Sequence, residues 1–102
     1  MKALGFVEVS GIVAAVEALD SMLKTASVEF VTWEKKLGGR LVTVVVTGDI
    51  SAVQQAVECG CARANEITTA VANAVIANPH EEVIKLIQIS AEKLNLVRKV
   101  VK

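Results

Sequence analysis

Apolar residues change their spacing from one segment of this chain to the next. Unbroken or alternating valine-rich runs are typical of β-strands, whereas apolar residues three or four positions apart mark one face of a helix. The order β-α-β-β-α-β-α predicts an α/β (α+β) domain in which a four-stranded mixed sheet, ferredoxin-like in its alternation, carries helices on one face. Strands are predicted over Ala3–Val9, Val28–Trp33, Leu41–Thr47 and Thr68–Ala77, and helices over Ile12–Lys24, Ala52–Ala64 and a last segment that starts at Asn78-Pro79.

Capping residues indicate where each helix begins. Ser10 is the expected N-cap of the first helix, and Ser51 with Gln54 forms a capping box for the second. Asn78 is the expected N-cap of the third helix, with Pro79 at its first position.

Apolar stripes indicate which side of each helix packs. The alanines of the first helix also allow it to sit close to a sheet. The stripes are Ile12, Val16, Leu19 and Leu23 on the first helix, and Val53, Ala56, Val57, Gly60 and Ala64 on the second.

Two adjacent glycines, Gly38 and Gly39, separate the second and third predicted strands and favour a β-hairpin. Lys35, Lys36 and Arg40 flank them. On these residues alone a solvated hairpin tip is the simpler interpretation. If several copies formed a ring with this loop at the axis, the loops would surround a small, positively charged aperture.

The composition favours an oligomer over a lone domain. The chain has 102 residues, of which 53% are hydrophobic, and a mean hydropathy of +0.52. One domain of this size does not need so many apolar residues, so part of its surface is expected to be buried in an assembly.

The charges and aromatic residues exclude several functions. Eleven cations balance eleven anions and only 3% of residues are aromatic, so we expect no nucleic-acid partner. No apolar run reaches the roughly 18 residues of a membrane span, and Glu8 follows the start too early for a signal peptide. We therefore expect a cytosolic protein without a membrane partner.

No cluster of residues predicts catalysis or metal binding. Cys59 and Cys61 point to different sides of a helix, and the single histidine, His80, is distant in sequence. Buried thiols and a capping or contact role for His80 are the expected interpretations. Glu81 and Glu82 fit a helix N-terminus better than an acid/base pair. The prediction is a non-enzyme without a cofactor.

Four motifs resemble bacterial microcompartment shell proteins of the BMC-domain family. The resemblance covers residues 3 to about 87 and is nearest to the single-domain, hexamer-forming type found in carboxysomes and metabolosomes. It implies that six copies form a flat tile, that tiles join into a shell around enzymes, and that metabolites cross at the sixfold axis. The motifs are Ala3–Glu8, Gly11–Lys24, Leu41–Ile50 and Ala77–Val83.

The same resemblance implies a pore loop, for which the family pattern is K-I-G-x-G. Gly39 takes the variable position, Arg40 replaces the second glycine, and the chain carries about one extra residue near Lys36. Small polar or anionic metabolites are expected to cross this pore. The implied pore-lining residues are Lys36, Leu37, Gly38, Gly39 and Arg40.

The resemblance also implies an edge at which hexamers meet. Lys24 matches the family lysine, and Pro79 and His80 match part of its R-P-H motif. Asn78 stands where the family has arginine and lacks that residue's five-donor fork, so tiling is expected to be weaker or different in geometry.

The last residues depart from the family. Residues 1–87 are interpreted as the shell domain and residues 88–102 as a basic, amphipathic helical extension, for which a solvated helix face is the simpler alternative. Its apolar pattern comprises Leu86, Ile89, Leu94, Val97 and Val101.

These patterns lead to one functional hypothesis and one alternative. The hypothesis is a structural shell protein whose partners are itself, other shell proteins and, through short targeting helices, the enclosed enzymes. The alternative is a small oligomeric ligand-binding regulatory domain of the cytosol. An enzyme is disfavoured because no convergent polar constellation is evident.

Overall fold

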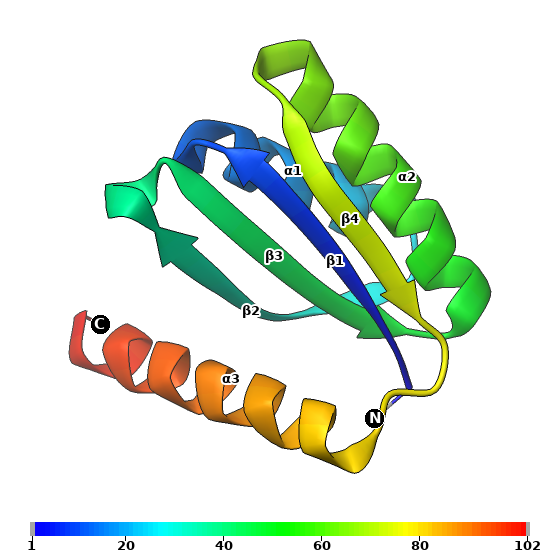
Figure 1. Cartoon of the computed structure of the whole chain (residues 1–102), viewed down its shortest axis with the longest axis vertical. Helices are drawn as coiled ribbons and strands as arrows, with labels where there is room; N and C mark the ends of the chain where they lie inside the picture. The colour runs from blue at the N-terminus through cyan, green and yellow to red at the C-terminus, as the bar shows by residue number, and fades with distance from the viewer. Residues whose placement is uncertain (1, 102) are drawn as a thin grey trace.

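The computed structural model describes residues 2–101 as one four-stranded sheet with three helices (Figure 1). The strand order is β2-β3-β1-β4 and each neighbouring pair is antiparallel. The predicted order of elements is confirmed, but the mixed sheet is wrong, because β3 lies between β1 and β2, which share a direction. The elements are β1 (Ala3–Ser10), α1 (Ile12–Thr25), β2 (Val28–Lys36), the 3₁₀ turn η1 (Leu37–Gly39), β3 (Leu41–Gly48), α2 (Ile50–Ile67), β4 (Ala70–Ile76) and α3 (Glu81–Val101).

The helices do not all cover one face of the sheet. α1 and α2 pack on the face that carries Val7 and Val44, and Figure 1 shows α1 behind the strands and α2 alongside β4. α3 contacts β2. Thr32 of β2 points to the other face, because neighbouring strand residues alternate, and its hydroxyl lies 2.8 Å from that of Ser90 in α3. The prediction of helices on one face therefore holds for α1 and α2 and is wrong for α3.

Small residues bring α1 close to the sheet. The predicted stripe of α1 does not face the core: Ile12, Val16 and Leu23 are exposed and Leu19 is only partly buried. The alanines allow a closer approach than the larger side chains would, so the helix turns its small face inward. The buried residues of α1 are Ala14, Ala15, Ala18 and Met22.

The predicted packing stripe of α2 is confirmed, since all five of its residues are buried. A Cβ added to Gly60 would lie 2.7 Å from Met22 Sδ, so α1 and α2 touch where this side chain is missing. A Cβ on Gly5 would lie 2.7 Å from Val53 Cγ1 and 2.8 Å from Val57 Cγ2. The two helices and the sheet thus meet through positions that leave no room for another methyl group.

The predicted capping residues of α1 and α2 are wrong. Ser10 stays in β1, where it pairs with Leu41, and Gly11 precedes α1 with φ +94°. α2 begins at Ile50 with Asp49 before it, so Ser51 and Gln54 lie inside the helix. α1 begins where the pairing of β1 ends, and α2 begins where β3 ends. Neither Gly11 nor Asp49 forms a side-chain capping hydrogen bond.

The start of α3 also differs from the prediction. The helix begins at Glu81, three residues after Asn78. The His80 carbonyl accepts the N–H of Ile84 at 3.1 Å, and its ring Nδ1 accepts the N–H of Glu82 at 3.0 Å. The capping role expected for His80 is confirmed, whereas the N-cap role of Asn78 and the first helical position of Pro79 are wrong.

Gly5→Ala is expected to lower the free energy of unfolding by about 1–3 kcal/mol, because the new methyl group would overlap two buried, β-branched valines. Chemical denaturation measures the change. Val53→Ala removes one of the two contacts, so the double variant should be less destabilised than the sum of the single changes. Strict additivity would contradict this packing.

Candidate functional site

The β2–β3 loop is a tight turn built on left-handed backbone. Lys36 and Leu41 form the last strand pair, which leaves Leu37 to Arg40 as the loop. Leu37, Gly38 and Gly39 have φ values of 54°, 68° and 89°. Glycine adopts this region without strain, whereas leucine does so at a steric cost. The Gly-Gly hairpin predicted from the sequence is confirmed.

The loop is held against the start of α1. The Gly11 N–H donates to the Arg40 carbonyl at 2.9 Å. Gly39 lies so close to Ile12 that an added Cβ would be 2.8 Å from Ile12 Cδ1. The loop therefore has a defined position relative to the helix layer.

The charged side chains near the loop point in different directions. Lys35 Nζ lies 6.0 Å from the centroid of the Trp33 ring, which makes a cation–π contact on the α1 side of β2. Lys36 lies on the other side with Glu34, whose carboxylate accepts a hydrogen bond from the Ser90 hydroxyl of α3. Arg40 is exposed at the tip. Of the three expected cations only Arg40 lies in the loop, and Lys35 and Lys36 lie on opposite sides of the end of β2.

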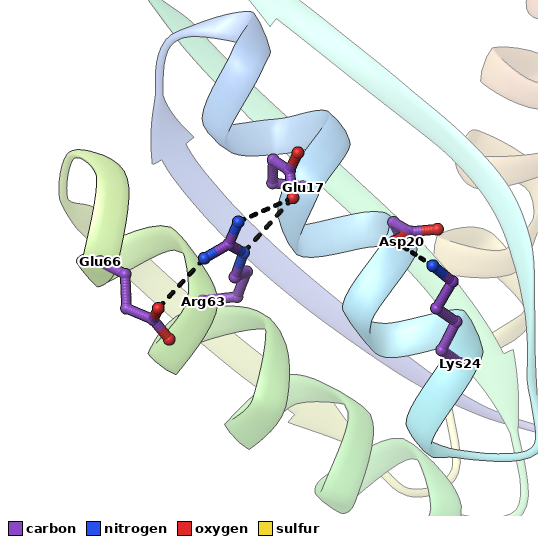
Figure 2. A network of polar contacts seen from close by, with 5 residues as sticks. All are labelled: Glu17, Asp20, Lys24, Arg63 and Glu66. Atoms are coloured by element: carbon purple, nitrogen blue, oxygen red, sulfur yellow. Dashed lines mark hydrogen bonds and ion pairs between the residues drawn. The ribbon is translucent and has the colours of Figure 1, made fainter.

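The predicted edge residues lie at the end of the sheet opposite the loop. β1 and β2 share a direction, and α1 returns the chain from the end of β1 to the start of β2, which places Lys24 at that start. β4 runs antiparallel to β1, so the segment Asn78–His80 leaves the sheet at the same end (Figure 1). Pro79 is buried and Asn78 is exposed. Lys24 pairs with Asp20 at 3.0 Å, and 74% of its side chain is exposed (Figure 2).

A polar network joins α1 to α2 on their outer side (Figure 2). Arg63 contacts Glu17 of α1 at 3.0 Å and Glu66 of its own helix at 3.1 Å. The hydrogen bond to Glu17 is the main reason that the pKa of Arg63 lies above its ordinary value. Sequence reasoning missed this network, because Glu17 and Arg63 are distant in the chain and no local spacing links them.

The cysteines form no site with His80. Cys59 and Cys61 are both free and half-buried, less buried than expected, and burial raises the pKa of the Cys61 thiol. Among the described residues, no three His, Cys, Asp or Glu side chains come together as metal ligands. The same part of the chain has no helix that is both long and apolar enough to cross a membrane.

The strand order and the helix pair define a small α/β domain of ferredoxin-like topology with a glycine hairpin at one end. Residues 3–79 match the BMC domain, and the chain belongs to that family. The resemblance deduced from the four motifs is confirmed.

Relatives in the family are shell proteins. The chain is 45% identical over 86 residues to the bacterial microcompartment shell protein PduA of Citrobacter freundii, which covers 84% of this chain and 91% of the relative. It is 46% identical over 81 residues to the carboxysome shell protein CcmK2 of Synechocystis sp., covering 78% of each chain. These relatives support a structural shell role.

A solved structure supports the fold. A crystal structure of a microcompartment protein from Desulfitobacterium hafniense DCB superposes with a TM-score of 0.76 at 32% identity. The match covers 83% of this chain, and this chain spans 48% of that longer one.

The variants Gly38→Ala and Gly39→Ala distinguish two constraints on the loop, the positive φ angles and the contact with Ile12. At Gly38 an added Cβ meets open space, so we expect only the cost of positive φ, about 1 kcal/mol of unfolding free energy. Gly39→Ala should cost more, because the methyl group also displaces Ile12. Denaturation curves of both variants test this order, and the reverse order would show that Ile12 does not support the loop.

Proposed function

We propose that this chain is a structural, non-enzymatic shell protein of a bacterial microcompartment, where it forms a homohexameric tile with a central pore. The observation that carries the proposal is that the glycine loop and the edge residues lie at opposite ends of one sheet. A subunit with one end at a ring axis and the other at the rim requires this separation. The protomer measures 34 × 33 × 23 Å, which suits a thin tile.

Exposed apolar residues supply surface for contacts between subunits. The outer side of α1 carries Ile12, Val13, Val16 and Leu23, of which Val13 is 70% exposed. Three of these residues, Ile12, Val16 and Leu23, belong to the stripe that the sequence assigned to the packed side of the helix. Its exposure in the protomer agrees with the apolar excess of the composition, because a ring buries such residues.

Ring assembly is expected to give a particle of roughly 65 kDa from six protomers of 10.8 kDa, or a whole multiple of that mass where rings associate. Light scattering at micromolar concentration measures it. A stable monomer would overturn the shell proposal. Stoichiometric binding of a metabolite by a smaller oligomer would favour the regulatory domain instead.

The proposed pore is lined by Lys36, Leu37, Gly38, Gly39 and Arg40. In a ring, Arg40 would be repeated six times around the axis with Lys36 close behind. Like charges in a narrow aperture repel one another and are stabilised by anions or by backbone carbonyls. Small anionic or polar metabolites should therefore cross more readily than cations.

Arg40→Glu is expected to reverse this charge preference. The measurement is the entry of matched anionic and cationic probes into assembled shells. Lys35→Glu is the matched control, because Lys35 sits over Trp33 on the α1 side of β2 and should change selectivity less. Equal permeability of wild type and Arg40→Glu would show that Arg40 does not line the pore.

The proposed edge comprises Lys24, Asn78, Pro79 and His80. Lys24→Ala should leave the hexamer intact and suppress the sheets or tubes seen by electron microscopy, because an exposed lysine at the rim is lost. Asn78→Arg should strengthen flat tiling by supplying the missing guanidinium. Loss of the hexamer in Lys24→Ala would place this residue inside the ring.

The remaining parts of the proposal concern the tail and the setting. Residues 1–87 form the shell domain and residues 88–102 a basic amphipathic extension, with α3 running through this boundary without a break. Other shell proteins meet the tile at its edges, and enclosed enzymes attach through short targeting helices. The shell lies in the bacterial cytoplasm.

A further inference from the structure

α3 has a second apolar side that the fold does not use. Its inner side faces the sheet, and the partly buried residues there are Val83, Ile84, Ile87, Ser90, Ala91 and Leu94. A different side carries Leu86, Ile89 and Leu96, which are 68%, 49% and 64% exposed, with Val97, 58% exposed, at its border. Lys93 continues the spacing between Ile89 and Leu96. We call Leu86, Ile89, Lys93 and Leu96 the outer seam.

The spacing of the outer seam is that of a coiled coil. Successive members are three, four and three residues apart, the alternation of a heptad repeat, whose mean spacing is about 3.5 residues. Glu82, four residues before Leu86, extends the same line. A narrow seam of this kind fits one partner helix, whereas a helix that packs on a globular core shows a wider apolar face.

The charges along the seam select an antiparallel partner with the same sequence. When Leu86 lies opposite Ile89 of a second copy, Glu82 lies opposite Lys93 of that copy. On the solvent side of the seam, Lys85 then lies opposite Glu92. The twofold axis repeats each contact, so the register contains four pairs of opposite charge.

Another antiparallel register lacks this complementarity. A shift by one heptad places Leu86 opposite Leu96 and Ile89 opposite Lys93. Glu92 then faces its own copy across the axis, which is repulsive. Each register makes one apolar pair and its symmetry copy, so the sequence of α3 distinguishes the first register by charge.

We propose that α3 helices of two copies pair antiparallel through the outer seam. Such a contact is isologous and needs a twofold axis, whereas neighbours in a sixfold ring are related by a sixth of a turn. Twofold axes relate tiles that meet edge to edge and rings that meet face to face. Because α3 lies along β2 on one face of the sheet and not at the proposed edge, the pairing joins two rings face to face, a step that rests on the proposed ring. One pair buries only a short apolar contact, and six pairs between two rings act together through their multivalency.

Light scattering of the full chain tests the pairing. Two joined rings have a mass of about 130 kDa, from twelve protomers of 10.8 kDa. Lys85→Glu and Glu92→Lys each place like charges opposite one another and should halve this mass. The double variant K85E/E92K, and an equal mixture of the two single variants, restore opposite charges and should restore it. Gln88→Glu is the control on the polar side of α3 and should leave it unchanged.

The outcomes separate this proposal from the ring itself. A wild-type mass near 65 kDa, or a mass of about 130 kDa that the single charge reversals do not change, would overturn the α3 pairing and leave the ring intact. A particle of about 22 kDa that the reversals dissociate would support the pairing and overturn the ring. A monomer would overturn both.

Discussion

Close packing through small residues is the constraint on which this fold depends. Gly5 leaves space for Val53 and Val57, and Gly60 leaves space for Met22. Together with the inward alanines of α1, these positions let two helices and a sheet meet at short distance. The helix layer therefore lies close to the sheet, and the larger apolar side chains of α1 remain at the surface.

The loop and the sheet topology together position the candidate site. Gly38 and Gly39 permit the left-handed turn, and contacts from Gly11 and Ile12 hold it against α1. The direction of β4 then sends Asn78–His80 to the far end of the sheet. The loop and edge residues are thus separated by backbone topology.

The sequence predicted the elements and the loop well, and the orientation of α1 badly. The Gly-Gly hairpin and the stripe of α2 depend on local chemistry, which spacing reveals. The inward side of α1 was misassigned because periodicity favours Ile12 and Val16 over alanine, although a close helix–sheet contact favours the smaller residue. Ser10 and Asn78 are residue types that often cap helices. Strand pairing of Ser10 and the hydrogen bond to the His80 ring instead determine where α1 and α3 begin. The Glu17–Arg63 contact joins residues that only the tertiary fold brings together.

A chain of three oxygen atoms fixes the height of α3 along β2. Thr32 is fully buried, its hydroxyl bonds to that of Ser90, and Ser90 donates to Glu34. Apolar contact alone has no direction, so the packing of α3 on β2 restricts the position along the strand less than hydrogen bonds do. The hydroxyl chain opposes displacement of the helix along β2, because such a displacement would break the hydrogen bonds of Ser90 to Thr32 and to Glu34 and leave Thr32 only its long bond to the Trp33 carbonyl. Ser90 therefore fixes the position of α3 along β2, and with it the positions of the residues on the exposed side of α3.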